Sequence, residues 1–223
     1  MENEVKTMEN LKKEKNFGVR MLIIVIVLII LIVLALFLRK AIIISSLENK
    51  AEEYANSNNF YMKKITYTGD VTTNEYYKKD DKTLMKMQTI MDEKVADATM
   101  VENNGKMNFF LDVGDKKVAK LDQDLTYNCE ISYLDTENLW ELLKISMFSR
   151  VDSVMFNGKE CYRVINDSGI ITNEIMMYID KETGLIVREV YVVSNEDVDY
   201  ISDYEYSFDT VKDEDVVGPN VTE

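Results

Sequence analysis

Residues 175–193 read IMMYIDKETGLIVREVYVV and decide the fold, because apolar side chains occupy both faces of two adjacent strand-like segments. On 175–179 and again on 185–193, apolar residues alternate with other apolar residues rather than with polar ones. A strand has this pattern when its sheet is covered on both sides or encloses a cavity. The turn D-K-E-T-G between them therefore predicts a hairpin in the middle of an antiparallel sheet.

Further segments with a two-residue period lie on both sides of this hairpin. Turn residues such as Asn103-Asn104-Gly105 and Asn157-Gly158 separate them, which is typical of antiparallel hairpins. The last segment alternates mostly aromatic with polar side chains and predicts a half-buried strand. The expected strands are 60–68, 73–79, 82–91, 95–101, 106–113, 116–122, 126–133, 150–156, 159–165, 170–179, 185–193 and 198–208.

A continuous apolar block near the N-terminus predicts a membrane span. Residues 21–38, MLIIVIVLIILIVLALFL, include no charged side chain, and in a helix they rise about 27 Å, close to the ~30 Å hydrocarbon core of a bilayer. A cleaved signal peptide would have an apolar region of roughly 7–15 residues followed by small residues. This block is longer and runs into Arg39 and Lys40, so we expect an uncleaved signal-anchor.

The charge distribution gives the expected orientation. Basic residues are more numerous before the apolar block than after it, which favours a cytoplasmic N-terminus. The net charge is +3 over residues 1–40 and −17 over residues 41–223. We expect a single-pass protein of the cell membrane with a cytoplasmic tail (1–20), a transmembrane helix (21–44) and an acidic extracellular domain (45–223).

Two helices complete the expected architecture. Ser45 and Glu48 have capping-box spacing, which predicts a juxtamembrane helix before the first strand. A second helix is expected after Asp135 or Thr136, with Trp140, the single tryptophan, anchoring the core. The expected fold class is α+β: one N-terminal transmembrane helix, then a curved antiparallel meander sheet with helices packed on one face.

The two cysteines, Cys129 and Cys161, both fall in the expected extracellular domain. Their spacing fits neither a C-x-x-C motif nor a zinc knuckle. In an oxidising compartment a disulfide between them would close a loop of about 33 residues, which stabilises by roughly 3–4 kcal/mol in the chain-entropy model. The alternative is two separate buried thiols, and the spacing leaves both interpretations open.

The composition excludes several classes of activity. The 223 residues include 40 acidic and 26 basic side chains, a net charge of −14, and no histidine. Nucleic acid needs a basic binding surface, so it is not an expected partner. Without histidine there is no Ser-His-Asp or Cys-His pair, and no glycine-rich phosphate motif is present. We therefore expect a non-enzymatic protein without a cofactor.

Short acidic runs raise the question of calcium binding. Residues 122–124 and 196–199 concentrate carboxylates, but neither run has the ligand ladder, central glycine and terminal glutamate of an EF-hand. These runs are therefore interpreted as solvated loops, and no metal site is expected.

The hairpin 178–189, YIDKETGLIVRE, resembles the strand–D-x-x-T-G-L–strand hairpin of the LolA-like lipoprotein-carrier family. The order of elements is similar as well: a helix, meandering strands, a helical insertion and further strands. In that family an apolar cavity holds acyl chains or a lipoprotein anchor. A soluble carrier must leave the membrane, whereas this chain has a span. The resemblance therefore implies a tethered lipid-binding module rather than a shuttle.

The chain includes 13 methionines, whose flexible side chains suit an adaptable lipid-binding cavity. An ordinary methionine-rich core is the alternative. If the sheet encloses a cavity, the side chains expected to line it are Met85, Met87, Met91, Phe109, Leu111, Met177, Ile179, Tyr204 and Tyr206.

Two functions remain open at this point. The first is an extracytoplasmic binding module for a lipid acyl chain or a lipoprotein. The second is a structural or interaction protein of the cell envelope, with a filled core and a protein partner. The first requires an internal cavity, and the second an exposed apolar patch of several hundred Å².

Overall fold

The computed structural model describes residues 2–91, 94–103, 106–113, 116–123, 130–136, 138–166, 173–193 and 200–219, with the backbone alone at some of these positions. The chain divides into two compact units, Met1–Ile43 and Ile44–Glu223. The boundary lies next to that expected from the sequence. The assignment of these parts to cytoplasm, membrane and exterior stays a prediction.

Helix α1, Glu2–Ala55, contains the whole apolar block. Most side chains of 21–38 are exposed, because no other described part of the chain covers them. Within the described residues, Gly18–Ala55 is the single helical stretch that is long and apolar enough to cross a membrane. By length and composition this stretch is an anchor or a signal sequence.

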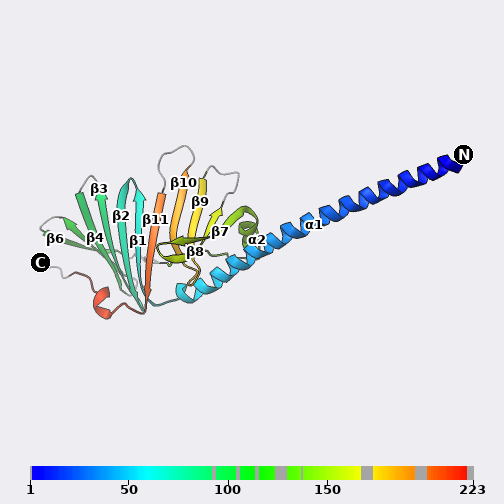
Figure 1. Ribbon diagram of the computed structural model, residues 1–223. Helices are drawn as coiled ribbons and strands as arrows, with labels where there is room; N and C mark the ends of the chain where they lie inside the picture. Colours follow the sequence, from blue (N-terminus) through cyan, green and yellow to red (C-terminus); the bar gives the residue numbers. More distant parts are fainter. Residues whose placement is uncertain are drawn as a thin grey trace. The chain divides into compact units, whose positions relative to one another are not determined.

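The second unit is built on an open antiparallel sheet of eleven strands (Figure 1), in the order β6-β5-β4-β3-β2-β1-β11-β10-β9-β8-β7. Consecutive strands are neighbours except β6 and β7, which lie at opposite edges, and the non-consecutive strands β1 and β11 pair at the centre. The strands are β1 Asn59–Thr68, β2 Asp70–Lys79, β3 Lys82–Met91, β4 Lys94–Asn103, β5 Lys106–Val113, β6 Lys116–Gln123, β7 Ser149–Phe156, β8 Lys159–Asn166, β9 Asn173–Asp180, β10 Ile186–Val193 and β11 Tyr200–Phe208.

The antiparallel pairing of β1 with β11 joins two meanders into one sheet. Its register runs from Phe60–Phe208 to Tyr67–Ile201. Within it the hydroxyls of Thr66 and Ser202 are hydrogen-bonded at 3.2 Å, and both side chains are buried. The chain therefore runs outward from the centre through β1–β6, crosses the sheet, and returns from the opposite edge through β7–β11.

One face of the sheet receives the end of α1, and we call it the α1 face. It carries Phe60 and Phe208, which are directly paired. Tyr54, near the end of α1, packs on Phe208 with 4.7 Å between ring centroids. The apolar side of this part of α1 is buried, as seen at Leu47 (2% exposed) and Ala51 (0%). Packing of this apolar face stabilises the attachment of α1 to the sheet.

The opposite face is covered by the C-terminal segment, and we call it the tail face. The short helix η1, Asp213–Val216, lies here with Val216 buried. Leu84 and Val101 are paired on β3 and β4 and are also buried. Gly218 lies close enough to Val101 that an added Cβ would come within 3.0 Å of its side chain. The C-terminal segment thus covers β2–β4 on this face. Coverage of β9 and β10 on both faces, which their two-sided apolar pattern predicts, stays a prediction.

The segment that crosses between the two sheet edges contains helix α2, Leu139–Phe148. Asn138 caps it, accepting a hydrogen bond from the Glu141 N–H at 3.1 Å. The prediction of a cap at Asp135 or Thr136 is wrong, because the Thr136 N–H and hydroxyl donate instead to the Glu48 carboxylate of α1. A side chain held by α1 is not available to the helix terminus.

Two further expectations for this segment are wrong. Residues 130–133 form one isolated bridge, Tyr133–Leu185, rather than a strand, while 126–129 lie outside the described residues. The β10 backbone is already paired with β9 and β11 along most of its length, so it offers little free edge. Trp140 does not anchor the core, since it is 71% exposed. The other expected strands, the second helix and the fold class are confirmed.

Gly184 allows a close approach between the β9–β10 turn and α1, and this contact gives a stability prediction. A Cβ at this position would lie 2.1 Å from the Leu47 carbonyl oxygen, and its φ is +75°. We expect Gly184→Ala to lower the free energy of unfolding by about 2–4 kcal/mol, from overpacking plus left-handed strain. Urea unfolding of the full chain, followed by circular dichroism, measures the change.

Gly69→Ala is the matched control. Its φ is +84° but no atom lies within 4 Å of the added Cβ, so only the backbone strain of about 1–2 kcal/mol applies. Equal losses in the two variants would contradict the packing of Gly184 on α1.

Candidate functional site

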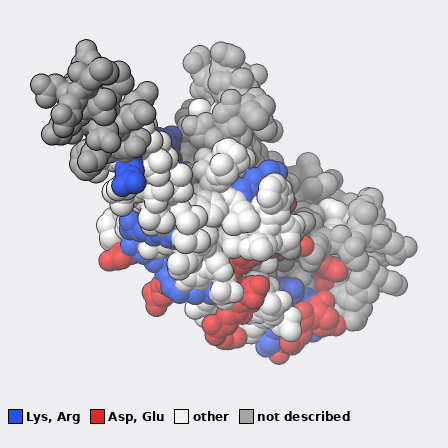
Figure 2. Space-filling view, turned by 90° about the vertical axis from the view of Figure 1, so that its right-hand side faces the viewer, with Lys and Arg blue, Asp and Glu red and all other residues white. Residues whose placement is uncertain are grey.

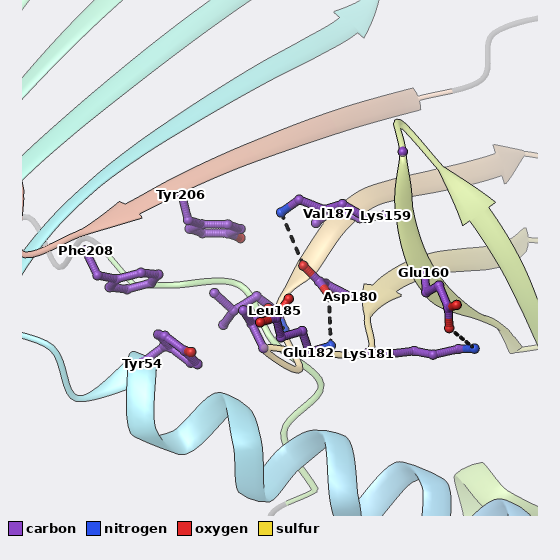
Figure 3. Close-up of a pocket in the computed structure, with 12 residues that line it drawn as sticks. Tyr54, Lys159, Glu160, Asp180, Lys181, Glu182, Leu185, Val187, Tyr206 and Phe208 are labelled. Carbon is purple, nitrogen blue, oxygen red and sulfur yellow. Dashed lines mark hydrogen bonds and ion pairs between the residues drawn. The ribbon is translucent and has the colours of Figure 1, made fainter.

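A cavity of about 690 Å³ opens on the α1 face (Figure 3). Four segments surround it: the end of α1, the β7–β8 turn, the β9–β10 hairpin and the end of β11. Its volume is in the usual range for small-molecule sites. The lining residues are Tyr54, Gly158, Lys159, Glu160, Asp180, Lys181, Glu182, Thr183, Leu185, Val187, Tyr206 and Phe208.

The floor of the cavity is apolar and aromatic. Leu185 and Val187 enter it from the start of β10 and are 1% and 5% exposed. Tyr206 and Phe208 alternate with polar residues on β11, which brings both rings to the same face, stacked at 6.4 Å between centroids. Tyr54 of α1 packs against Phe208 from the other side. The floor therefore combines side chains from three elements distant in sequence.

Asp180 holds the turn that forms one wall. Its Oδ1 accepts a hydrogen bond from the Glu182 N–H at 2.9 Å, and its backbone N–H donates to the Leu185 carbonyl, also at 2.9 Å. Its Oδ2 lies 3.2 Å from the Lys159 Nζ, and the side chain is only 7% exposed. A buried carboxylate is costly unless it is paired, so these contacts explain an aspartate at this position.

Lys181 connects the two turns that border the cavity. Its Nζ donates to Ser153 Oγ at 2.6 Å and to Glu160 Oε2 at 3.2 Å, and it lies 4.8 Å from the Tyr162 ring centroid. Its backbone N–H donates to the Glu160 carbonyl at 3.0 Å. These contacts fix the β7–β8 turn to the β9–β10 turn, so the rim is organised before any ligand binds.

The hydroxyl groups of the tyrosines in this region are kept neutral. Burial raises the pKa of Tyr206 well above its usual value, and the neighbouring Tyr204 and Glu189 raise it further. Its hydroxyl donates to the Ile186 carbonyl at 3.0 Å. The pKa of Tyr204 is also raised, first by burial and then by its hydrogen bond to Glu189 at 2.7 Å. The floor of the cavity therefore carries no charge at physiological pH.

The described residues show no cluster of three histidine, cysteine, aspartate or glutamate side chains that could hold a metal ion. The side chains of the acidic runs 122–124 and 196–199 lie outside the described residues. Four of the five charged residues at the cavity form ion pairs, Lys159 with Asp180 and Lys181 with Glu160, and the fifth, Glu182, is exposed. The arrangement is suited to binding an apolar group beneath a polar rim.

The side chains expected to line a cavity share the α1 face. The register connects Phe109 through Met100, Met85, Tyr76 and Met62 to Tyr206, in one row across six strands. The neighbouring row connects Met87 to Tyr204.

Tyr206 alone among the nine expected residues lines the cavity described here. Met177 lies on the same face, because it pairs with Glu189, which in turn pairs with Ser202 of β11. Ile179 is fully buried. The side chains of Met91 and Leu111 lie outside the described residues. That these methionines and Phe109 line a ligand cavity stays a prediction.

Several lining residues were not expected from the sequence. Lys159, Asp180, Lys181 and Thr183 belong to hairpin turns, which pattern analysis treats as connections rather than as sites. The signal that could have found them is the D-K-E-T-G turn itself, singled out for its resemblance. Tyr54 and the cavity-facing position of Val187 depend on how α1 docks, which no local pattern specifies.

Cys161 lies in β8 and is not among the residues that line the cavity. It has no exposed surface and forms no disulfide with any other described residue. Burial, followed by the charge of Asp180, raises its pKa, which keeps the thiol protonated and unreactive. Cys129 lies outside the described residues, so a bridge between the two cysteines stays a prediction.

Comparisons with known proteins give structural similarity without a sequence family. No family model matches the chain, and no curated protein matches it. The MucA/MucB complex of Pseudomonas aeruginosa has a TM-score of 0.47 and 12% identity, covering 78% of this chain and 60% of that chain.

A crystal structure of MucB has a TM-score of 0.41 and 10% identity, covering 80% of this chain and 63% of that chain. The hypothetical protein CT021 from Chlamydia trachomatis has a TM-score of 0.32 and 6% identity, and the match covers 77% of this chain and 97% of that chain. The chain thus spans less than two thirds of the MucB chains. The expected LolA-like resemblance stays a prediction.

The raised tyrosine pKa values predict a loss of stability in alkali. Above about pH 10 an unfolded tyrosine releases its proton, whereas folded Tyr206 keeps it, so the unfolded state binds fewer protons and the free energy of unfolding falls as pH rises. We expect Tyr206→Phe to reduce this fall, and to cost about 1 kcal/mol at neutral pH through the lost hydrogen bond.

Urea unfolding of the full chain at neutral pH and at about pH 11 measures both effects. Tyr200→Phe is the control, because Tyr200 is 39% exposed. The same alkaline loss in wild type and Tyr206→Phe would show that Tyr206 does not contribute to it.

Proposed function

We propose that this chain is a membrane-anchored, non-enzymatic binding module of the cell envelope that holds an acyl chain of a lipid or lipoprotein. The observation that carries the proposal is the cavity on the α1 face, with an apolar floor and a polar rim. Small-ligand sites combine an apolar surface with polar groups that orient the ligand, and this pocket has both.

The floor favours an aliphatic ligand. Leu185, Val187 and Phe208 offer no hydrogen-bonding side-chain atoms, and the Tyr206 hydroxyl already donates to a backbone carbonyl. A polar ligand placed here would lose its hydrogen bonds to water without replacement, whereas an acyl chain gains about 25 cal/mol for each Å² of apolar surface buried.

The rim can accommodate the polar end of such a ligand. Lys159 is 56% exposed on its side chain, while its partner Asp180 is buried. Glu182 is exposed on the adjacent turn. The rim thus carries both positive and negative charges close to the solvent, and the apolar groups lie below it. An amphiphile needs this arrangement, because its polar end and its acyl chain require different surroundings.

The apolar helix supports membrane anchoring in this proposal. The block 21–38 is followed by the second unit after only a few residues, since that unit begins at Ile44. A cavity so close along the chain to a membrane span has the bilayer as its nearest source of acyl chains. The excess of basic residues before the span supports an extracellular position for the second unit.

The alternative is an interaction protein of the envelope with a filled core and a protein partner. The buried apolar side chains at the base of the cleft, Leu185 and Val187, favour the binding module, because they offer an apolar ligand a contact surface. The two interpretations differ in whether the isolated protein carries a small ligand.

Native mass spectrometry of the full chain, released from nanodiscs, tests the proposal. We expect a bound acyl-chain amphiphile, and displacement of a fluorescent long-chain fatty acid added as a probe. Val187→Trp should fill the cavity and reduce binding of the probe at least about tenfold, because a bulky ring replaces ligand volume.

Val190→Trp is the matched control. Val190 pairs with Ile201, which places it on the opposite face of β10 from the cavity, and it is half-buried. Protein that never binds the fatty acid, or equal losses in both variants with intact circular dichroism, would overturn the proposal.

A further inference from the structure

Helix α2 exposes its large apolar side chains and buries a small polar one. Ser146 has no exposed surface, and it is the one buried residue of α2. In contrast, four large apolar side chains are more than half exposed, and we call them the α2 patch: Leu139 (70%), Trp140 (71%), Met147 (66%) and Phe148 (52%).

Helix α2 is apolar on most sides, with Leu142, Leu143 and Ile145 half-buried, and the exposure of the α2 patch is unusual for a helix of a soluble domain. Such a helix turns its apolar stripe to the core and its polar residues to water. Single exposed apolar residues are ordinary, but four within ten residues of one helix form a patch that marks a contact with another apolar phase.

The helical positions of these residues form one broad side. Trp140 and Met147 are seven residues apart and lie on one stripe, flanked by Leu139 and Phe148. Lys144, exposed on the same side, is the single charge on that side. A tryptophan with a lysine beside it on an apolar face is typical of helices in the membrane interface, where the lysine extends to the headgroups.

Only a short stretch of chain separates α2 from the apolar block. The Thr136 N–H, three residues before α2, donates to Glu48 Oε1 at 2.8 Å. Glu48 is only ten residues after Leu38 in sequence. So short a tether gives α2 a high effective concentration at a bilayer that holds the apolar block.

The local charge also fits a bilayer surface. The second unit is strongly acidic, and acidic side chains gather along the lower edge of the face seen in Figure 2. Helix α2 differs, because it carries Lys144 against Glu141 and therefore has no net charge. An anionic leaflet therefore repels α2 less than it repels the rest of the domain.

We propose that α2 is an interfacial helix that inserts the α2 patch into the leaflet of the bilayer in which this chain is anchored. The proposal rests on the membrane anchoring of the proposed function, but not on ligand binding in the cavity. The helix lies flat in the headgroup region, with Lys144 directed to the lipid phosphates and Ser146 toward the domain.

Trp140 is the only tryptophan of the chain, so intrinsic fluorescence reports on α2 alone. The full chain is reconstituted into vesicles of phosphatidylcholine, with and without phosphatidylglycerol and with lipids brominated near the headgroup. We expect brominated lipid to quench Trp140 about twofold or more, and iodide in the water to quench it weakly, because the ring lies at the interface.

Met147→Lys tests the face, and Met155→Lys is its control. Both methionines are 66% exposed, but Met155 lies in β7 outside the patch. We expect Met147→Lys to reduce quenching by brominated lipid at least about twofold, because a charge in the apolar side opposes insertion, and Met155→Lys to leave it unchanged.

Three results would overturn the proposal. Strong iodide quenching without lipid quenching would show that Trp140 faces water. Protection from both quenchers would show that protein, from this chain, a second copy or a partner, covers the patch. Equal effects of the two lysine variants would exclude the assigned face.

The fatty-acid probe on the same vesicles separates this proposal from the proposed function. Normal probe binding with no lipid quenching of Trp140 would overturn the interfacial helix alone. Lipid quenching without probe binding would overturn the cavity ligand and leave the interfacial helix standing.

Discussion

The pairing of β1 with β11 is the interaction on which the rest of the structure depends. It pairs Phe60, near the start of the domain sequence, with Phe208, near its end, and so joins two meanders into one sheet. Asn59 secures the joint, because its side chain exchanges two hydrogen bonds of 3.0 Å with the backbone of Val211. Without this register the aromatic floor would not form beside α1, and the C-terminal segment would have no fixed place on the tail face. Pairing over so long a loop is slow to form, so we expect it late in folding.

Local patterns predicted the strands because each has a two-residue period and ends at a recognisable turn. They did not predict which strands meet at the centre, since the β1–β11 register is set by packing between residues far apart in sequence. Trp140 shows a second limit: α2 is apolar on nearly all sides, so periodicity assigns no preferred face, and the tertiary contacts of Thr136 with Glu48 set its orientation. The cavity was predicted only at Tyr206, because its other walls are turns such as Asp180–Thr183, whose polar residues carry no periodic signal.

The segment between the two meanders connects the two surfaces proposed to bind. The Ser132 carbonyl accepts a hydrogen bond from the Ile186 N–H at 3.0 Å, next to the cavity floor. Thr136 then binds α1, and α2 follows directly. The same short stretch of chain therefore contacts β10 at the cavity and positions the apolar helix. The polar rim of the cavity is fixed separately, by the contacts of Lys181 between the β7–β8 and β9–β10 hairpins.

Because Gly184 has no side chain, the end of α1 and the β9–β10 turn are in direct backbone contact. The backbone of α1 rests there directly on the backbone of the β9–β10 turn, with no flexible side chain between them to absorb displacement. Lys50 adds a hydrogen bond from α1 to the Lys181 carbonyl of the same turn. A tilt or pull applied to this end of α1 is therefore transmitted as a shift of Asp180–Thr183, which line the cavity. The end of α1 is therefore joined to one wall of the cavity through backbone atoms, and a change of side-chain rotamer cannot loosen that contact.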